Sequence, residues 1–351
     1  MEIEDYDAAK AAEMLWKVIS PILIVFGSAG NILVIALLTR KRSRYIPTSV
    51  YLSSLAFSDL IVLNTGLMRQ WITHTFGIDI REDFSEFGCR FHWFIVYGVT
   101  QYSSWMLICV TLERLTSTLL PHRRRVLCTT KSALISVLVI LLFLVLLNGH
   151  YLFGYGDRID DGTGRIEKCQ PLTDTYNNFI LYTWAWIDLC VFFIIPMTIL
   201  LVGNSLIVNN VITSHRKSRR SVMPSIESRT NNRKNKQQTS KISSLTISLM
   251  LVSVLFCICI TPIVVYPIGQ PYWETGASNK KKATLFLIET LANLLMYVNH
   301  SINFILYFMS GKRFRNEVKQ LFCKMKVYPD TEASAVPSRS NCKTLPNSTP
   351  N

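Results

Sequence analysis

The stretch from Cys89 to Arg125 decides the fold, and it reads CRFHWFIVYGVTQYSSWMLICVTLERLTSTLLPHRRR. Its middle is apolar apart from small or amphipathic polar side chains, and its end carries the acid and base Glu113-Arg114 followed by a run of arginines. At ~1.5 Å per residue, a helix from Cys89 to Arg114 can cross a hydrocarbon layer ~30 Å thick with some tilt. Positive residues stay in the cytosol during membrane insertion, so the arginine end is predicted to face the cytosol.

The composition of the whole chain also indicates a membrane protein. The 351 residues are 49% hydrophobic and only 17% charged, with a mean hydropathy of +0.26, which is too apolar for a soluble domain of this size. The net charge of +14 would suit nucleic-acid binding, but the basic residues lie between apolar runs. That arrangement favours cytosolic loops over a nucleic-acid surface, so no nucleic-acid partner is expected.

The cysteines and histidines do not suggest a metal site or an enzyme. Most of the nine cysteines lie inside apolar runs, and Cys257-Ile258-Cys259 would direct its thiols to divergent faces of a helix with no histidine nearby. The six histidines are scattered, and no nucleophile and base are seen together. We therefore expect no metal, no cofactor apart from an allosteric sodium ion discussed below, and no enzymatic activity.

The apolar runs predict an all-α bundle of seven transmembrane helices. Residues 1–14 form a short acidic segment, residues 311–323 an amphipathic basic surface helix, and residues 324–351 a disordered cytosolic tail. Within residues 15–310, the third cytosolic loop at 215–241 carries nine Lys or Arg and should be disordered. The helices are expected at about 15–39, 48–73, 89–114, 132–153, 178–212, 242–267 and 283–309.

The loop after the first helix sets the orientation. It reads Arg40-Lys41-Arg42-Ser43-Arg44, a short basic run that would be retained in the cytosol. The amino terminus is then extracellular, and the chain is a multi-pass protein of the plasma membrane. Cys89 and Cys169 fall on the same outer, oxidising side, so a disulfide between them would pin the loop over the third helix. Two unpaired thiols are the alternative.

Several polar side chains fall within the predicted helices. A carboxylate such as Asp59 costs roughly 2.5 to 3.5 kcal/mol near the bilayer centre, so it should face the bundle interior and have a partner. Arg69 has two open interpretations, a charge that extends toward the interface or a contact to a ligand. The seventh helix has a polar load that a lipid-facing helix could not carry: Glu289, Asn293, Asn299, His300 and Asn303.

These markers, one helix after another, resemble the rhodopsin-like (class A) G-protein-coupled receptors over about residues 15–323. Cys89 and Arg114 are spaced as the disulfide cysteine and the arginine of that family are. The Asn-Phe-x-x-Tyr form of the seventh helix resembles invertebrate neuropeptide receptors for FMRFamide-like and myosuppressin peptides. The other matching residues are Gly30, Asn31 and Val34, Leu55, Ala56 and Asp59, Phe256, Cys259 and Pro262, and Asn303, Tyr307 and Phe314.

The chain also departs from that family's pattern. Leu115 replaces the usual aromatic residue after the arginine, and Ile260 replaces the tryptophan of the sixth helix. Asn204 replaces the fifth-helix tyrosine, and the fourth-helix tryptophan is missing. Phe304 replaces the seventh-helix proline, which removes an expected kink.

The resemblance implies roles for residues inside the bundle and at its cytosolic end. A sodium ion would bind in a polar pocket at mid-membrane, although His300 beside the pocket could distort it. Glu113 would hold Arg114 in the inactive state, and the sixth helix would swing outward on Pro262, with Tyr307 as a further switch residue. The residues of the predicted polar core are Asn31, Asp59, Ser103, Asn299 and Asn303.

The resemblance also places a ligand cavity at the outer end. Its acids, Asp188 and Glu289, together with acidic outer loops, would attract a cationic peptide. A direct pair between Arg69 and one of these acids is the alternative. Val96 stands where aminergic receptors keep an aspartate, which argues against a biogenic amine. The predicted ligand-binding residues are Arg69, Tyr97, Gln101, Trp184, Asp188, Glu289 and Asn293.

The function predicted from the sequence is therefore a receptor that binds an extracellular neuropeptide and activates a heterotrimeric G protein. Receptor kinases and arrestin are further expected partners of the Ser- and Thr-rich tail, and Cys323 is a candidate for palmitoylation, although a free thiol is nearly as consistent. A receptor for a non-peptide small molecule is the alternative. A secondary transporter is a further one, but the chain lacks the repeated halves and paired broken helices of transporters.

Overall fold

The computed structural model describes residues 5–40, 45–83, 85–159, 166–220 and 231–310, with Arg315 and Val318; the side chains of residues 214–220, 231–249, 306, 307, 309 and 310 are not described. Six helical segments in this part of the chain are long and apolar enough to span a membrane. The seventh crossing comes from α13 (Asn279–Ser301) and α14 (Asn303–Ser310). It carries the polar load noted above, which explains its lower hydropathy.

The first four crossings follow the predicted order, with ends shifted by a few residues. A π-helical turn at Leu63–Leu67 joins the two parts of the second crossing. The short helices α4 (Ile80–Asp83) and α6 (Arg124–Leu127) lie between crossings. The crossings are α1 (Asp7–Leu38), α2 (Pro47–Val62) with α3 (Met68–Phe76), α5 (Glu86–Leu119), and α7 (Thr130–Asn148) with the short α8 (Tyr151–Gly154).

The fifth and sixth crossings extend into the predicted third loop. The fifth is built from α9 (Asp174–Asn178), α10 (Ala185–Asp188) and α11 (Ile195–Arg220), joined by π-helical turns at Phe179–Trp184 and Leu189–Ile194. The sixth is α12 (Asn231–Glu274). Both helices thus occupy the two ends of the segment 215–241, which the sequence predicts to be disordered, and residues 221–230 lie outside the described part.

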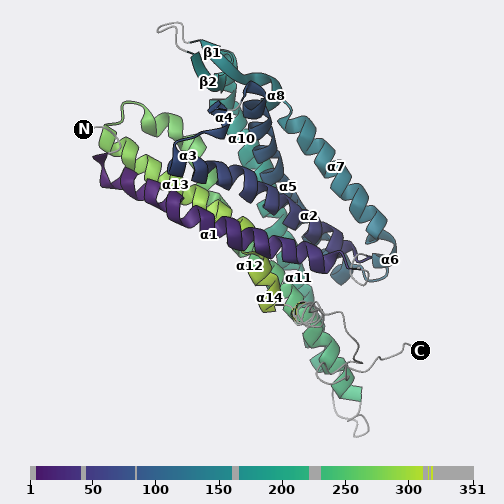
Figure 1. Ribbon diagram of the computed structural model, residues 1–351. Helices are drawn as coiled ribbons and strands as arrows, with labels where there is room; N and C mark the ends of the chain where they lie inside the picture. The colour runs from purple at the N-terminus through teal and green to yellow at the C-terminus, as the bar shows by residue number, and fades with distance from the viewer. Residues whose placement is uncertain are drawn as a thin grey trace, which may run out of the picture.

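Figure 1 shows the crossings side by side, with α1 along α13 and α7 at one edge of the bundle. The strands β1 (Tyr155–Ile159) and β2 (Ile166–Pro171) pair antiparallel and rise above one end of the bundle. We call this end, where the hairpin is joined to α5 by a disulfide, the disulfide end. The opposite end, which carries α6 with Arg124 and Arg125, is the basic end.

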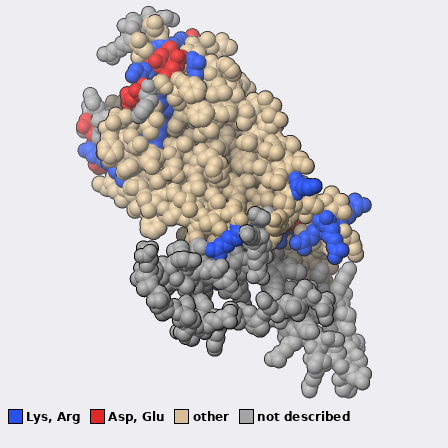
Figure 2. All heavy atoms as spheres, turned by 45° about the vertical axis from the view of Figure 1, so that its right-hand side comes forward, with Lys and Arg blue, Asp and Glu red and all other residues tan. Residues whose placement is uncertain are grey.

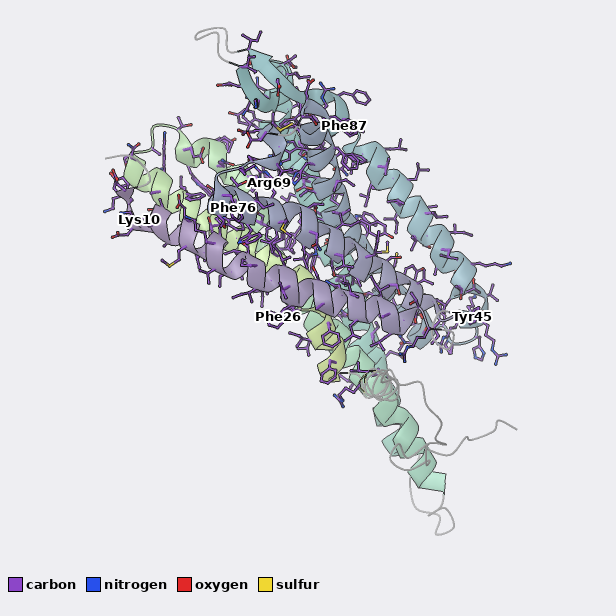
Figure 3. The ribbon with its side chains drawn as sticks, in the orientation of Figure 1. Lys10, Phe26, Tyr45, Arg69, Phe76 and Phe87 are labelled. Carbon is purple, nitrogen blue, oxygen red and sulfur yellow. A yellow bond between two sulfur atoms is a disulfide. The ribbon has the colours of Figure 1, made fainter. Side chains whose placement is uncertain are left out.

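The surface between the two ends is apolar. In Figure 2 the Lys, Arg, Asp and Glu side chains of the visible face gather near its ends, with a wide uncharged band between them. Figure 3 shows Phe26 pointing away from α1 on the outside of the bundle, and this side chain is 73% exposed. Leu146 of α7 is likewise 73% exposed. Such a band matches the hydrocarbon layer of a bilayer.

The first helix begins earlier than predicted. It starts at Asp7, and Ala9, Ala12 and Trp16 are buried against the rest of the bundle. The indole of Trp16 stacks on the ring of His74 with centroids 5.7 Å apart. Residues 7–14 therefore belong to the first helix and not to a separate amino-terminal segment, because small and aromatic side chains on one face give this turn a packing surface.

The seventh crossing is interrupted despite the missing proline. Helix α13 ends at Ser301 and α14 begins at Asn303. The carbonyl of His300 accepts a hydrogen bond of 3.0 Å from Nδ2 of Asn31 on α1, so this carbonyl has a partner outside its own helix. Phe304 also packs closely on Gly30, where an added Cβ would lie 2.9 Å from the Cβ of Phe304. The crossing is therefore interrupted at Ile302 although the proline is missing.

The predicted surface helix lies mostly outside the described residues. Of residues 311–323 the structure describes Arg315 and Val318, and both are helical. Val318 is buried, and Nη1 of Arg315 donates to the carbonyl of Phe308 at 3.2 Å. Cys323 and the tail from 324 to 351 lie outside the described residues, so palmitoylation and a disordered tail stay predictions.

Candidate functional site

A cavity of about 360 Å³ lies between the helices toward the disulfide end. Six of the seven predicted ligand-binding residues line it, namely Arg69, Tyr97, Trp184, Asp188, Glu289 and Asn293. Of the two acids, Asp188 and Glu289, neither has an ion-pair partner among the described residues. Val96, which stands at the position of the aminergic aspartate, lines it as well. These residues, singled out from the sequence, therefore form part of the cavity wall.

Arg69 lines the cavity but is already paired. Its Nε donates to Oδ1 of Asp79 at 2.7 Å, and its Nη2 donates to Oδ2 of the same carboxylate, which makes a two-pronged ion pair. Burial acts to raise the pKa of Asp79, but the hydrogen bonds and positive charges of Arg69 and Arg81 together outweigh it and hold that pKa below its usual value. The alternative in which Arg69 pairs with Asp188 or Glu289 is therefore wrong, since the partner is a loop residue.

Gln101 lies behind the wall of the cavity and not on it. It is 0% exposed, its Nε2 donates to Oδ1 of Asp188 at 2.7 Å, and its Oε1 accepts from Nδ2 of Asn148 at 2.7 Å. This chain of hydrogen bonds joins the fifth crossing to α5 and α7. Gln101 thus orients the cavity-facing carboxylate of Asp188, and Asn148 is a partner that the sequence analysis did not single out.

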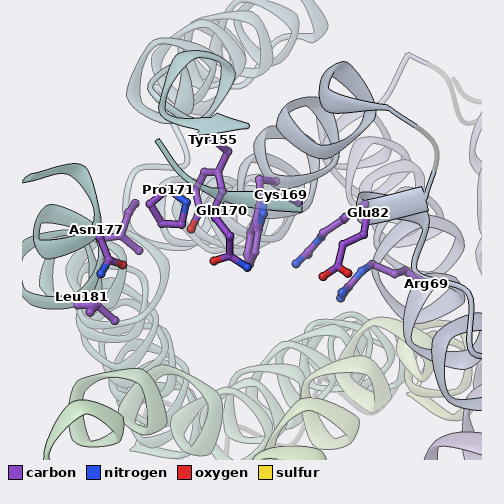
Figure 4. A pocket seen from close by; sticks show the side chains of 11 residues that line it. Arg69, Glu82, Tyr155, Cys169, Gln170, Pro171, Asn177 and Leu181 are labelled. Carbon is purple, nitrogen blue, oxygen red and sulfur yellow. The ribbon is translucent and has the colours of Figure 1, made fainter. Parts of the chain in front are cut away.

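A second pocket, of about 270 Å³, shares Arg69, Arg81 and Trp93 with the cavity, and we take it as the opening of the cavity at the disulfide end. Figure 4 shows Arg69 and Glu82 on one side of this opening and Asn177 and Leu181 on the other. Tyr155 and Gln170 of the hairpin form part of its rim. The mouth of the cavity is therefore built from α3, α4, the hairpin and the start of the fifth crossing.

The disulfide between Cys89 and Cys169 fixes the hairpin at this mouth, as the sequence predicts. Cys169 itself has a positive φ of 56°, a conformation that a non-glycine residue adopts rarely. Arg90, next to Cys89, adds a hydrogen bond of 2.6 Å from its Nε to the carbonyl of Tyr155. The sequence analysis treats the segment around Cys169 as a loop and misses the two strands, because each is short and lacks an alternating apolar pattern.

Removing the disulfide should destabilise the bundle at its disulfide end. Because the bond closes a separation of 80 residues, the Cys89→Ser and Cys169→Ser variants should each lose about 2 to 5 kcal/mol of stability. The double variant should lose no more than either single one, since both remove the same bond. Thermal melting of the purified protein measures this, with Cys190→Ser, an exposed free cysteine, as the control. Additive losses would contradict the prediction.

At mid-bundle, Asp59 is the centre of a buried polar cluster. Its Oδ1 accepts from Oγ of Ser103 at 3.0 Å and contacts Nδ1 of His300 at 2.7 Å, and its Oδ2 accepts from Nδ2 of Asn303 at 2.6 Å. An ionised carboxylate only accepts, so Nδ1 of His300 is the donor in this contact when Asp59 is ionised. Asp59 is 0% and His300 1% exposed. Four members of the predicted polar core thus meet, since Asn31 joins through the carbonyl of His300.

At the basic end, Thr48 of α2 connects the acid and the base of the third crossing. Its Oγ1 donates to Oε2 of Glu113 and accepts from Nη2 of Arg114 at 3.0 Å. The sequence analysis expects Glu113 itself to hold Arg114. In the structure a hydroxyl from another helix lies between the two, because successive side chains on a helix point in different directions. Pro262 lies inside α12, and the side chain of Tyr307 is outside the described part.

A comparison with known protein families accounts for this arrangement. The family described as 7 transmembrane receptor (rhodopsin family) matches residues 30–307, which is most of the chain. The chain belongs to the rhodopsin family of seven-transmembrane receptors. The predicted fold is confirmed, as is the prediction that the chain is a receptor and not an enzyme. Its apolar helices and its family identify it as a multi-pass membrane protein.

Individual members of the rhodopsin family are similar over most of their length. Galanin receptor 2a of Danio rerio is 24% identical over 317 residues, which cover 89% of this chain and 79% of that receptor. Growth hormone secretagogue receptor type 1 of Homo sapiens is 26% identical over 308 residues, which cover 85% of this chain and 78% of that receptor. The finer resemblance to FMRFamide-like and myosuppressin receptors stays a prediction.

Two residues that depart from the rhodopsin-family pattern, Asn204 and Ile260, have defined surroundings in the structure. Asn204, at the position of the fifth-helix tyrosine, is buried and donates from Nδ2 to Oγ of Ser253 on α12 at 2.7 Å. Ile260, at the position of the tryptophan, is 0% exposed in the main core. A hydrogen bond between two helices thus stands where the family has an aromatic residue, and an aliphatic side chain fills the place of an indole.

The polar cluster of this receptor does not fit a sodium ion as it lies. A hard cation needs several oxygen ligands with free lone pairs. Here Ser103, His300 and Asn303 all direct hydrogens at Asp59, and His300 supplies nitrogen in place of oxygen. Asn299, the remaining predicted ligand, is buried on α13. The sodium pocket expected from the resemblance is therefore filled by hydrogen-bond donors.

Sodium should consequently have no specific effect on this receptor. We expect the melting temperature of the purified receptor to be the same in NaCl and in KCl at equal ionic strength and neutral pH. Comparing two salts at one ionic strength cancels general screening, which acts equally in both. A melting temperature that rises with sodium alone would contradict this prediction, because a bound ion stabilises the folded state by mass action.

Proposed function

We propose that this receptor binds an extracellular peptide in the cavity at its disulfide end and activates a heterotrimeric G protein at its basic end. The observation that carries the proposal is the cavity itself, which opens to the outside beside the pinned hairpin. Its position at the end opposite Arg114 separates a ligand site from a coupling site. Two such sites, linked by one bundle that has two arrangements, are what a transmembrane signal requires.

A peptide suits the lining of the cavity better than a small apolar molecule. The walls carry acids, amides and two arginines together with aromatic rings, and the polar groups are spread over α4 and the second, third, fifth, sixth and seventh crossings. A peptide offers charged and amide groups at matching intervals, whereas a small apolar ligand would leave many of them unpaired. The names of the similar receptors, for galanin and for growth hormone secretagogues, support this choice. A non-peptide small molecule remains the second candidate.

The distribution of charge supports an orientation with the amino terminus outside. Arg123, Arg124 and Arg125 lie at the basic end, where the positive-inside tendency places the cytosol. The disulfide then lies on the oxidising side of the plasma membrane. Arg114 and its neighbours would meet the G protein, and the tail beyond residue 323 would be the substrate of receptor kinases and the binding partner of arrestin.

A screen of synthetic peptides tests the proposal. The receptor is expressed in cells that report cytosolic calcium and cAMP, and a peptide library is applied from outside. At least one peptide should give a response that requires the receptor and disappears when the G proteins are blocked. Solute flux without any such response would favour a transporter, and responses to non-peptide compounds alone would favour the second candidate.

A further inference from the structure

Three charged side chains that line the ligand cavity have no ion-pair partner in the described part of the chain, namely Arg81, Asp188 and Glu289. Arg81 comes from the short helix α4, and Glu289 comes from α13. Arg69 also lines the cavity, but Asp79 neutralises it. Among the described residues the cavity therefore has one cation and two acids without an ion pair. Asp188 accepts a hydrogen bond from Gln101, whereas the carboxylate of Glu289 has no hydrogen-bond partner in this part of the chain.

Arg81 is held in an orientation that suits an anion. Its guanidinium carbon lies 3.5 Å from the centre of the Trp93 ring, and its Nε donates to Nδ1 of His92 at 2.8 Å. These contacts fix the plane of the guanidinium and use one of its hydrogens, so its two Nη groups have no acceptor among the described residues. Burial, followed by repulsion from Arg69, lowers the pKa of Arg81 to about 9. A bound carboxylate would offset both effects and match the fork geometry of the guanidinium.

Glu289 is arranged to receive a cation. It is half-buried on the cavity wall, and Asn293, one turn further on, bonds to its backbone carbonyl and not to its carboxylate. Asp188 places a second carboxylate on the same cavity, with Oδ1 occupied by Gln101. A carboxylate in this setting gains from an opposite charge, because partial burial has removed part of its water.

We propose that the cavity recognises a peptide end that carries two opposite charges, a carboxylate that contacts Arg81 and a cationic side chain that contacts Glu289. The inference rests on the proposed peptide-binding function and adds the charge pattern of the peptide. A peptide with a neutral or amidated end would leave Arg81 desolvated and without an anion. An acidic peptide without a basic residue would leave Glu289 desolvated and without a cation. Discrimination therefore comes from buried charges that the wrong ligand leaves unpaired.

Four sets of synthetic peptides test this inference. All are N-acetylated hexapeptides. Their C-terminus is either a carboxylate or an amide, and each contains either arginine or its neutral isostere citrulline, with mixed residues at the remaining positions. The readout is the peptide concentration that half-maximally raises the melting temperature of the purified receptor. The wild type should prefer the set with carboxylate and arginine by about 10- to 100-fold over either set that lacks one charge, since one charge-assisted hydrogen bond supplies this much.

Two variants assign the charges to residues. Arg81→Gln should lose the preference for carboxylate over amide and keep the preference for arginine over citrulline, and Glu289→Gln should do the reverse. Arg81→Lys keeps the charge and should keep part of the carboxylate preference. The matched controls are Glu167→Gln, an exposed acid on β2 that does not line the cavity or its opening, and Lys282→Gln, an exposed base on the helix of Glu289; both should behave as wild type.

The outcomes separate this inference from the proposed function. If peptides stabilise the wild type but their charges make no difference, or if both preferences survive in Arg81→Gln and Glu289→Gln, the charge pattern is wrong and peptide binding stands. If no peptide of any set stabilises the wild type and the cell screen is also silent, the peptide-binding function falls, and this inference falls with it. The melting temperature of each variant without peptide shows that it is folded.

Discussion

Replacing Arg114 by alanine is expected to abolish G-protein activation while ligand binding stays near the wild-type level. Arg114 lies at the basic end, where its Nη2 donates to Thr48, and the ligand cavity lies at the other end. Alanine removes a permanent charge and five hydrogen-bond donors from the surface proposed to meet the G protein. An arginine at the centre of an interface often contributes 2 kcal/mol or more, which is about 30-fold in affinity.

Nucleotide exchange on a purified G protein measures this effect in membranes that contain the receptor and an active peptide from the screen. Arg125→Ala is the control, because it removes an exposed positive charge from the same end without touching Thr48. The control should signal at the wild-type level. Normal nucleotide exchange in Arg114→Ala would contradict the coupling role, and loss of peptide binding in it would show that its effect is not confined to the basic end.

Replacing Asp59 by alanine should destabilise the receptor by about 3 to 5 kcal/mol. The carboxylate is the shared acceptor of Ser103, His300 and Asn303, and each of these residues is at most 5% exposed. Each donor left without an acceptor costs about 1 to 3 kcal/mol, although relaxation of neighbours reduces the total. Thermal melting of the purified receptor should show a large fall in the melting temperature.

Ser58→Ala is a matched control for this change. Ser58 precedes Asp59 on the same helix and is equally buried, but its hydroxyl bonds to the carbonyl of Leu55 one turn earlier. That carbonyl keeps its place in the helix when the hydroxyl is lost, so the melting temperature should change little. Equal losses in Ser58→Ala and Asp59→Ala would mean that packing in α2, and not the shared carboxylate, stabilises this region.

The helices, and the fact that their polar residues face the interior of the bundle, could be predicted from the sequence. A membrane span needs a long apolar run, and a polar group within it has to face the interior, so both features follow from local composition. Asp59, Asn31 and Asn303 are buried together as this argument requires. The disulfide between Cys89 and Cys169 was also predictable, because topology places both cysteines at one end of the bundle.

Contacts between distant segments could not be predicted in the same way. Thr48 looks like an ordinary polar residue at the start of a helix, and only the packing of α2 on α5 brings it between Glu113 and Arg114. Arg81 lies in a loop with mixed charges, and its place in the cavity depends on the position of Trp93. His300 was noted as unusual in sequence, but its bond to Asp59 depends on how α13 is rotated.

One carboxylate holding partners on α5, α13 and α14 makes the motions of these helices interdependent. If any one of them slides or rotates by more than the tolerance of a hydrogen bond, Asp59 loses a partner and the remaining donors have to rearrange around it. Intermediate positions, with some donors unpaired in a dry core, are costly. The hydrogen bonds around Asp59 should therefore adopt one of two complete arrangements. A small displacement of the helices by a ligand at the disulfide end would then change the arrangement of the helices at the basic end in a single step.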